Sequence, residues 1–367
     1  MVYFDHNATT PIDNRVLEAM QPYLASFFGN PSSLYRQGRV VRSAIDMARE
    51  QIAALVGVQP AQVIFTSGGT EANNLALMGA GQQSKLAVSA VEHPSVMEPA
   101  RYLQQLGHLV DLVNVDGNGV INSQAIEQVI AQQPHFVSIM LANNETGVVQ
   151  DVAGIAAQLK AHGITVHTDA VQALGKIPVS FSQLAVDLMS LSSHKIYGPK
   201  GCGALVVAKD VAVQPMLLGG GQEQGYRAGT ENVAAIVGFG KAAELVGWEL
   251  AQRSKHVLSL RMLLERELVA ISGAKIFAQC ADRLPNTVQF GIEGVDGEML
   301  LMRLDQKGFA VSSGSACASG AVEPSPVLIA MGIDPVEAKT AIRISFGQDN
   351  TEAEVLELIQ LLKKLIA

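Results

Sequence analysis

The sequence predicts an α/β fold, with a large domain built on a mainly parallel sheet and a smaller α+β domain at the C-terminal end. The chain has 367 residues, which is long for one core and fits two domains. Hydrophobic residues make up 48% of the chain and charged residues 16%, so ample apolar surface is available for burial. Between residues 63 and 208, short apolar runs alternate with longer helix-like stretches, a pattern typical of parallel strands joined by helices.

Several runs in this region have the length and apolar content of buried strands. Their apolar character is continuous, which indicates a sheet covered by helices on both faces. In such sheets ligands bind beyond the carboxyl ends of the strands, so a site is expected at the corners that follow them. The predicted strands are residues 63–66, 86–89, 136–140, 164–167, 187–190 and 204–207.

The rest of the chain shows a different pattern. A helical stretch over 233–253 precedes a helix near 257–270, strands near 286–290 and 341–346, and a final helix from Glu352. We therefore expect a large domain at 15–250 and a small domain at 251–367, with residues 1–14 packed on the small domain. Residues 238–243 imitate a dinucleotide-binding fingerprint, but no strand precedes them, and we interpret their glycines as helix packing.

Composition argues against several classes of protein. The formal net charge of -8 gives no electrostatic footprint for DNA or RNA. The first residues do not resemble a signal peptide, and the apolar runs are too short to span a membrane. Cys202, Cys280 and Cys317 are widely spaced and odd in number, which favours free thiols in a reducing compartment. We expect a cytoplasmic protein without a metal site.

The corner after the first strand has the composition of an anion site. Gly69 and Thr70 stand where a strand gives way to a helix, and the N–H groups at a helix N-terminus bind phosphate. An ordinary turn with Thr70 as helix cap explains the same residues equally well. At the next corner His93 begins a helix; it suits stacking on a flat ring, although a cap or surface role is commoner for a lone histidine.

Two later corners carry amides and carboxylates. Asn143, Asn144 and Glu145 directly follow an apolar strand, where burying them without a ligand is costly. Asp169 ends the next strand, and Gln172 follows it. A carboxylate in this place suits a protonated ring nitrogen, because it makes the ring a better electron sink. A helix N-cap is a comparably common role for Asp169.

The strand ending near residue 190 leads to a lysine with unusual surroundings. Lys195 lies in a glycine-rich corner, where burial and neighbouring cations lower the pKa of an amine and make it nucleophilic toward an aldehyde. We expect His194 and Lys200 to supply the positive surroundings. A lone lysine is usually a solvated surface group, but successive chemistry-bearing corners on one sheet make that interpretation improbable for Lys195.

Three further segments complete the set of candidate residues. The glycine-rich loop 218–230 ends in Thr230 and suits closing over phosphate or contacting a neighbouring subunit, with a plain surface loop as the alternative. Cys317 stands among small residues and is the candidate nucleophile, whereas Cys202 and Cys280 suit buried thiols. Arg343 lies in an apolar strand and calls for a buried anion, either a substrate carboxylate or a structural carboxylate.

Taken together, these motifs resemble the cysteine desulfurases of the NifS/IscS type, from Tyr3 to the final helix. The most specific are Ser-Ser-His-Lys-Ile-Tyr-Gly-Pro-Lys-Gly at 192–201, Asn-Asn-Glu-Thr-Gly at 143–147 and Ser-Ser-Gly-Ser-Ala-Cys at 312–317. The resemblance implies the type I pyridoxal-phosphate (PLP) fold of the aspartate aminotransferases, and a homodimer with active sites at its interface. His6 departs from the family pattern, in which a tyrosine or similar residue is expected.

The resemblance also implies a role for each candidate residue. Lys195 corresponds to the lysine that binds PLP covalently, His93 to the ring-stacking residue and proton carrier, Asp169 to the partner of the ring nitrogen, and Gln172 to the partner of the ring oxygen. The remaining roles are phosphate binding by Gly69, Thr70, Ser192 and His194, with Thr230 contributed by the other subunit, substrate carboxylate binding by Asn144 and Arg343, and sulfur acceptance by Cys317.

The implied activity is removal of sulfur from L-cysteine, giving L-alanine and a persulfide on Cys317. The persulfide would serve a sulfur-acceptor or scaffold protein in iron–sulfur cluster or other sulfur-compound synthesis. The chain ends just after its last predicted helix, which leaves the acceptor open. A selenocysteine lyase, another class V aminotransferase-like enzyme and a non-catalytic protein of the same fold are the alternatives, although Cys317 and Lys195 favour a desulfurase.

Overall fold

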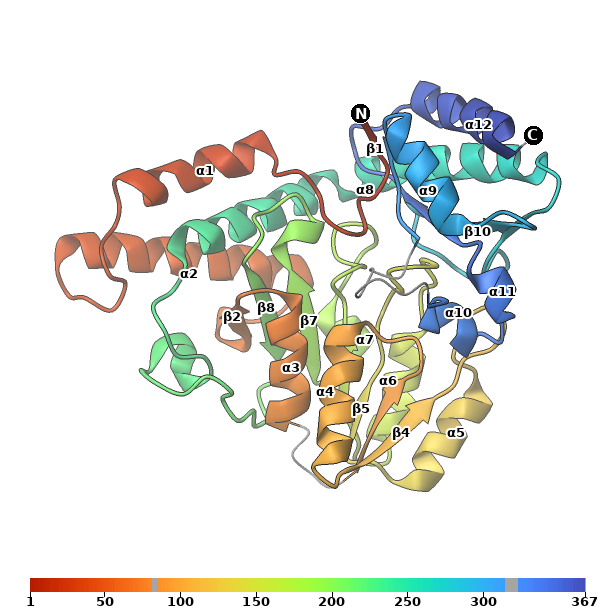
Figure 1. Cartoon of the computed structure of the whole chain (residues 1–367). Coiled ribbons are helices and arrows are strands. Elements are labelled where there is room, and N and C mark those ends of the chain that lie inside the picture. The colour runs from red at the N-terminus through yellow and green to blue at the C-terminus, as the bar shows by residue number, and fades with distance from the viewer. Residues whose placement is uncertain (81–84, 314–322, 367) are drawn as a thin grey trace.

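The central feature of the molecule is a seven-stranded sheet with the strand order β2-β8-β7-β6-β5-β3-β4. The computed structural model describes residues 1–80, 85–313 and 323–366 (Figure 1). The strands are β2 (Val63–Thr66), β3 (Lys85–Ser89), β4 (Leu109–Val113), β5 (Phe136–Ser138), β6 (Thr165–Asp169), β7 (Leu188–Ser192) and β8 (Gly203–Val207). All six predicted strands are confirmed, with small shifts at their ends.

The sheet differs from the prediction at two strands. β8 runs antiparallel to both β2 and β7. The stretch that joins β7 to β8, residues 193–202, is too short for the crossover of a dozen or more residues that a parallel pair needs. β4 was not predicted; it pairs parallel to β3 at the edge of the sheet, where Leu109 and Leu112 are exposed and the strand lacks the burial of its neighbours.

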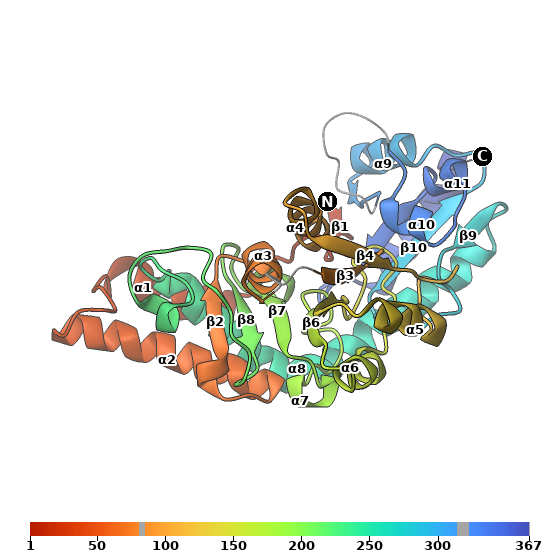
Figure 2. The same cartoon turned by 90° about the horizontal axis from the view of Figure 1, so that it is seen from below.

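Helices cover both faces of this sheet, as predicted. Along each strand, successive apolar side chains enter different cores: Leu86 and Val88 pack with α3 (Gly69–Ala80) and α4 (Pro94–Gln105), whereas Ala87 belongs to the core on the other face. Figure 2 shows α3 and α4 on one side of the sheet and the other covering helices opposite them. The helices of that second face are α1 (Asn14–Ala25), α2 (Arg36–Val56), α5 (Ser123–Gln132), α6 (Val152–Lys160), α7 (Phe181–Leu184) and α8 (Val233–Val269).

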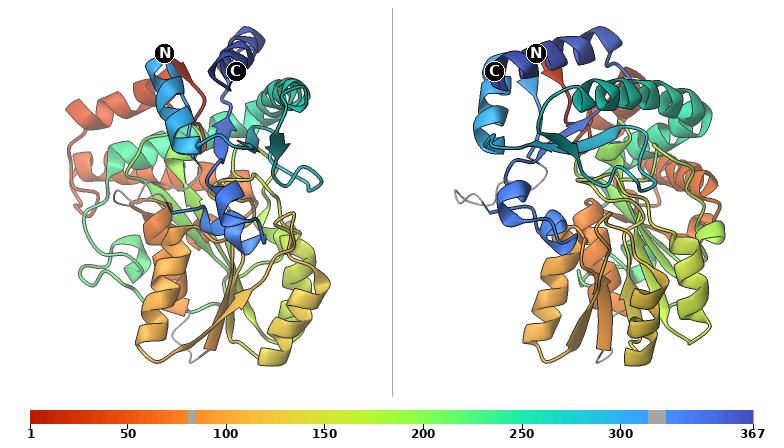
Figure 3. Two further views of the ribbon diagram at one scale, coloured as in Figure 1. Left: turned by 45° about the vertical axis from the view of Figure 1, so that its right-hand side comes forward. Right: turned by 90° about the vertical axis from the view of Figure 1, so that its right-hand side faces the viewer.

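A second core forms around a three-stranded antiparallel sheet with the order β12-β10-β9. Its strands are β9 (Ala274–Ile276), β10 (Thr287–Ile292) and β12 (Ile342–Ser345), and its helices are α9 (Gly297–Gln306) and α12 (Glu352–Ile366). The short helices α10 (Pro326–Ala330) and α11 (Pro335–Ala338) pack in a separate cluster with Val91, Met140 and Phe277. The C-terminal half of α8 also packs here through Leu260, Leu264 and Leu268. Figure 3 shows α12 lying across the top of this part.

α8 is one continuous helix of 37 residues, where the sequence predicted two. Residues 254–256 contain neither glycine nor proline, so the chain has no local reason to break there. The glycines of 238–243 lie within α8, and a Cβ added at Gly240 would lie 2.6 Å from the Cα of Ala48 on α2. The prediction that these glycines serve helix packing is therefore confirmed.

The N-terminal segment contacts both parts of the molecule. β1 (Val2–Tyr3) pairs in parallel with β11 (Phe309–Ala310), and Phe4 is buried in the second core. From residue 7 onward the chain crosses to the central sheet, where Thr10 bonds the backbone of His194. Three short 3-10 helices, η1 (Pro60–Gln62), η2 (Ser193–Lys195) and η3 (Gln222–Gly225), complete the structure. Across the described ranges, the helices are all too short or too polar to span a bilayer.

Candidate active site

A cavity of about 290 Å³ opens where β2, β3, β5, β6 and β7 end. These five strands run in the same direction, so the corners after them meet at one edge of the sheet. The cavity is lined by nine of the predicted site residues, which are Gly69, Thr70, His93, Asn144, Asp169, Gln172, Ser192, His194 and Lys195. Residues up to 126 positions apart in the sequence thus line the same cavity.

Lys195 ends η2, the single turn that follows β7. Its Nζ donates to the backbone carbonyls of Asn7 at 2.6 Å and Ala8 at 2.7 Å. Burial and, next, the positive charge of Arg343 lower the pKa of this amine to about 8, although Asp169 and Asp5 oppose the shift. An amine with this pKa is partly unprotonated near neutral pH, and it can attack a carbonyl carbon or accept a proton.

The expected source of positive charge around Lys195 is wrong. Burial, together with the positive charges of Lys195, Lys200 and Lys176, lowers the pKa of His194 to about 4, so this imidazole is neutral at pH 7. Lys200 is exposed and acts mainly in the surroundings of His194. The cation that acts on Lys195 is Arg343, which comes from the second sheet and is 148 positions away in sequence.

His93 is a helix cap and also lies in the cavity wall. It caps α4, where its Nδ1 accepts the backbone N–H of Ser95 at 3.1 Å, and it also lines the cavity. Because Nδ1 is an acceptor in this bond, a neutral His93 carries its proton on Nε2. Burial together with Lys195 lowers its pKa, although Asp169 opposes the shift.

Asp169 is linked to His93 through two residues that the prediction did not include, Asn73 and Ser95. Asn73 donates to the Asp169 Oδ2 at 2.6 Å and to the Ser95 Oγ at 2.8 Å, and Ser95 Oγ lies 2.7 Å from the His93 Nδ1. Asp169 Oδ1 also accepts the backbone N–H of Val171. These donors fix the position of the Asp169 carboxylate at the end of β6.

The part of the cavity wall that contains Gly69 and Ser192 has the features of an anion site. α3 begins at Gly69, and its positive N-terminal end faces the cavity with Thr70. A Cβ at Gly69 would lie 2.8 Å from the Val171 side chain, so only glycine lets the backbone come this close. The Ser192 Oγ is buried there and makes no hydrogen bond with any described residue. This indicates that the hydroxyl is available to bind a ligand.

Gln172 is held in place by two groups outside the predicted set. Its Nε2 donates to the Asn7 carbonyl at 2.9 Å, and its Oε1 accepts from the Nζ of Lys176. The side chain lines the cavity between Asp169 and Lys195. Its amide is therefore oriented before any ligand binds.

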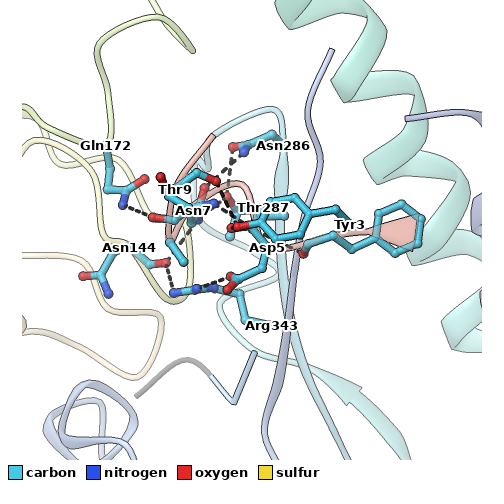
Figure 4. A network of polar contacts seen from close by, with 12 residues as sticks. Tyr3, Asp5, Asn7, Thr9, Asn144, Gln172, Asn286, Thr287 and Arg343 are labelled. Carbon is cyan, nitrogen blue, oxygen red and sulfur yellow. Dashed lines mark hydrogen bonds and ion pairs between the residues drawn. The ribbon is translucent and has the colours of Figure 1, made fainter. Parts of the chain in front are cut away.

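Arg343 forms an ion pair with Asp5, and its Nη1 donates to the Asn144 carbonyl at 3.0 Å (Figure 4). Arg343 is not among the residues that line the cavity, and the Asn144 side chain is. The sequence left two anions open for Arg343, a substrate carboxylate and a structural carboxylate. The structure shows a structural carboxylate, that of Asp5. The Nε of Arg343 is buried and has no partner within the described chain, so the guanidinium keeps a donor for a further acceptor.

The corner at residues 143–145 has partners within the protein, contrary to expectation. Asn143 Oδ1 accepts the N–H groups of Glu145 and Thr146, and the Glu145 carboxylate accepts the Ser325 hydroxyl. Burial raises the pKa of Glu145. Asn143 and Glu145 thus shape the loop, and only Asn144 faces the cavity.

The other predicted residues lie apart from the cavity or outside the description. Thr230 is exposed and is absent from the cavity wall of this chain. Cys317 lies outside the described residues. Cys202 is a buried free thiol, as expected, whereas Cys280 is exposed, contrary to expectation, because it lies in the loop after β9. No group of three or more metal-binding side chains occurs in the part of the chain that the structure describes.

Asn7 is the residue that the sequence analysis missed most completely. It is 1% exposed. Its Nδ2 donates to the Asn144 carbonyl and the Thr287 hydroxyl, and its Oδ1 accepts from Asn286 and Lys176. Figure 4 shows it between Gln172 and Asn286. An asparagine near the chain start gives no local signal of such a role, because all of these partners are distant in sequence.

The cavity fits the parts of PLP. The orphan Ser192 hydroxyl and the α3 N-terminus suit the phosphate, the Asp169 carboxylate suits a ring N–H, and the Lys195 amine suits the aldehyde. The fit rests on the convergence of these groups on one cavity and on the buried Ser192 hydroxyl, which has no partner among the described residues.

Comparisons with known proteins agree with this description. A family model described as aminotransferase class-V matches residues 2–358. The chain is 41% identical over 372 residues to a protein named cysteine desulfurase IscS from Dictyoglomus turgidum, covering 100% of this chain and 94% of that protein. A solved NifS-like protein has a TM-score of 0.93 at 37% identity, covering 100% of this chain and 99% of its own. A structure titled SspA in complex with cysteine has a TM-score of 0.85 at 32% identity, covering 96% of this chain and 100% of its own.

Proposed function

The chain belongs to the class V aminotransferase family, and we propose that within this family it acts as a PLP-dependent cysteine desulfurase. The observation that carries the proposal is the cavity in which an amine of pKa about 8, a carboxylate and an imidazole converge from separate strand ends. Curated relatives with the desulfurase name match this chain over its full length, which supports the same assignment.

The residues that line the cavity would hold PLP. Lys195 would bind the aldehyde, and Asp169 would accept the ring N–H. His93 would cover the ring, and Gln172 would donate to the ring oxygen. The phosphate would lie against Gly69, Thr70, Ser192 and His194. When bound, PLP supplies an electron sink for the carbanion formed at the substrate α-carbon.

The residues of the chain itself would do the remaining work. Asn144 would bind the carboxylate of L-cysteine and orient its α-carbon, with Arg343, which donates to the Asn144 carbonyl, as the second partner. The Lys195 Nζ, held by two carbonyl oxygens, would take the α-proton, and the His93 Nε2 would move protons on the opposite side. The Asn73 bond would hold the Asp169 carboxylate in place.

Cys317 would be the sulfur acceptor. We assign it from the sequence motif at 312–317, since it lies outside the described residues. Its thiolate attacks the sulfur of the bound substrate, so L-cysteine and the Cys317 thiol become L-alanine and a Cys317 persulfide, with sulfur the only atom transferred besides protons. We propose that an acceptor or scaffold protein then takes this sulfur, for iron–sulfur clusters or other sulfur compounds.

The protein would act as a homodimer in the cytoplasm. Large apolar side chains are exposed around α1 and α2 and in the loop after β8, among them Phe28, Leu34 and Leu218. Thr230 lies near the end of the same loop region, where it would reach the phosphate of a second copy. Free thiols at Cys202 and Cys280 support a reducing compartment.

The proposal is tested by incubating pure protein with L-cysteine and a reductant and measuring sulfide and alanine. Wild-type protein should be coloured and should release both products in equal amounts. Lys195→Ala should release neither, because it lacks the amine that binds the cofactor and takes the proton. Hydride reduction followed by mass spectrometry should find the cofactor on Lys195; an adduct on another lysine, or a colourless wild type, contradicts the proposal.

A second experiment isolates Cys317. Cys317→Ser should keep the colour of the bound cofactor but form no persulfide and release no sulfide. Cys202→Ser, which changes a buried thiol away from the cavity wall, is the matched control and should stay active. Full activity of Cys317→Ser would refute the assignment.

A further inference from the structure

Lys176 is a buried lysine that the proposed chemistry does not use. It follows the turn after β6 and is 8% exposed. Its Nζ donates to two carboxamide oxygens, the Asn7 Oδ1 at 2.8 Å and the Gln172 Oε1. Burial holds its pKa well below the ordinary value, and Lys195 and Arg343 lower it further. A lysine whose partners are neutral amides is costly to bury, so a compensating role is expected.

The bond to Gln172 settles which way that carboxamide faces. Gln172 Nε2 donates to the Asn7 carbonyl, and its Oε1 accepts from Lys176, so the amide is fixed at both ends. A flipped amide would set its oxygen against the Asn7 carbonyl and its N–H groups against the amine. One hydrogen of Nε2 is used in the bond to Asn7. The other is left, in the described structure, for an acceptor in the cavity that Gln172 lines.

The bond to Asn7 connects Lys176 to the proposed cofactor lysine. The Asn7 carbonyl accepts from both Gln172 and Lys195, and the Asn7 side chain is shared with Asn286. The three side chains of Lys176, Gln172 and Lys195 therefore converge on one residue, which Figure 4 places beside Gln172. Losing the Lys176 amine would leave the Gln172 oxygen without its partner in a buried setting.

We propose that Lys176 is a positioning residue that holds the Gln172 carboxamide with an N–H directed into the cavity, toward the ring oxygen of the cofactor. The inference rests on the PLP binding proposed above. A donor at that oxygen stabilises its negative charge, so the proton shared with the Lys195 nitrogen leaves at a lower pH. Lys176 would tune this step without touching cofactor or substrate.

The test uses full-length Lys176→Met, which keeps an unbranched side chain of similar length but has no donor. Two properties are measured: the dissociation constant for added PLP, and the pH midpoint of the visible absorption change of the bound cofactor. The dissociation constant should rise about tenfold, the value of one hydrogen bond. The midpoint should move upward by about one pH unit. Lys160→Met, on the surface at the end of α6, is the matched control and should match wild type in both.

Gln172→Leu and the double variant show whether Lys176 acts through Gln172. If it does, adding Lys176→Met to Gln172→Leu leaves the midpoint where Gln172→Leu alone puts it. The inference is overturned if Lys176→Met shifts the midpoint in the Gln172→Leu background as much as it does in wild type. It is also overturned if the Lys176→Met protein has the wild-type midpoint and affinity. Should Lys176→Met fail to fold, Lys176→Gln retains an N–H donor, and its midpoint should stay closer to wild type than that of Gln172→Leu. A wild-type protein that does not bind PLP would instead defeat the proposed function.

Discussion

At the scale of single residues, the amine of Lys195 carries the most chemical information. Two opposing influences act on it: burial and Arg343 favour the neutral amine, whereas Asp169 and Asp5 favour the ammonium. Burial is the largest of these, which gives a pKa of about 8. The carbonyls of Asn7 and Ala8 hold Nζ without adding a charge. The position of this amine and its pKa are therefore set by different parts of the chain.

This pKa predicts how cofactor capture depends on pH. With a pKa of about 8 the neutral amine makes up about one tenth of the protein at pH 7 and about nine tenths at pH 9. The rate at which cofactor-free protein binds PLP, followed by stopped-flow absorbance, should rise about tenfold over this range and then level off. The same reaction with a small free amine corrects for titration of PLP itself. A corrected rate that keeps rising beyond pH 10 would contradict the assigned pKa.

The sequence predicted the site residues that lie directly at strand ends, and it missed those supplied from a distance. Asp169 and Lys195 could be predicted because the carboxyl ends of parallel strands meet at one edge of the sheet. A local motif after each strand therefore indicates a common cavity. Asp5 and Asn7 contact residues more than 130 positions away, and their neighbours in sequence give no hint of it. Lys176 was missed because a lysine beside a glycine is usually exposed.

At the scale of elements, His167 links three strands of the central sheet. It lies on β6 and is fully buried, with Nδ1 2.9 Å from the Ser138 hydroxyl on β5 and Nε2 2.9 Å from the Ser190 hydroxyl on β7. Burial lowers its pKa to about 3. The imidazole therefore stays neutral in the folded state over most of the acid range, whereas it is protonated in the unfolded chain below about pH 6.5.

His167 should accordingly make the fold sensitive to acid. Its folded pKa lies below its unfolded value, so its contribution is fully present above about pH 6.5 and is lost as pH falls toward 3. Between pH 7 and pH 4.5 the loss amounts to about 2–3 kcal/mol of unfolding free energy. In urea unfolding, His167→Gln should lose less stability than wild type over this range. His162 is exposed, so His162→Gln should lose as much stability as wild type. A His167→Gln protein that also loses as much stability as wild type between pH 7 and pH 4.5 would contradict this account.

The contact between α2 and α8 makes a second prediction at this scale. A Cβ at Gly240 would lie 2.6 Å from the Ala48 backbone, so the two helices must separate to admit it. Gly240→Ala should lower the unfolding free energy by about 1–3 kcal/mol through overpacking. Gly247→Ala on the same helix meets no atom within 4 Å and should be neutral or stabilising by up to about 1 kcal/mol. Equal effects of the two changes on thermal unfolding would rule out this packing argument.

At the scale of the whole molecule, the two sheets are joined by α8 and by the N-terminal segment. We propose the domain division at residues 250 and 251, which lies inside α8, so a rigid helix would form the joint. The division of the first residues is less simple than we expected: Phe4 packs in the second core, while Asn7 bonds Gln172 and Lys195 of the first. Periodicity locates the sheets, but it gives no information on where a short irregular segment runs between them.

The apolar face around α1 and α2 extends this reasoning to a second copy of the chain. In Figures 1 and 2, these helices and the loop after β8 lie on the same side of the molecule, away from α11. Phe28 is 80% exposed and Leu34 89% exposed, so both offer apolar surface to a partner. Contact with the same face of a second copy would bury it and would bring in a Thr230 that this chain's own cavity lacks.

Light scattering on a sizing column should therefore give wild-type protein twice the mass of one chain. Phe28→Glu combined with Leu34→Glu should shift it toward the monomer, because burying two carboxylates in an apolar contact is costly. Val336→Glu on α11, also strongly exposed at 77%, is the matched control and should leave the dimer intact. The monomeric variant should also bind PLP more weakly, since Thr230 would no longer reach the phosphate. If the double variant remains a dimer, the contact lies elsewhere. If wild-type protein is a monomer, the proposed contact does not form.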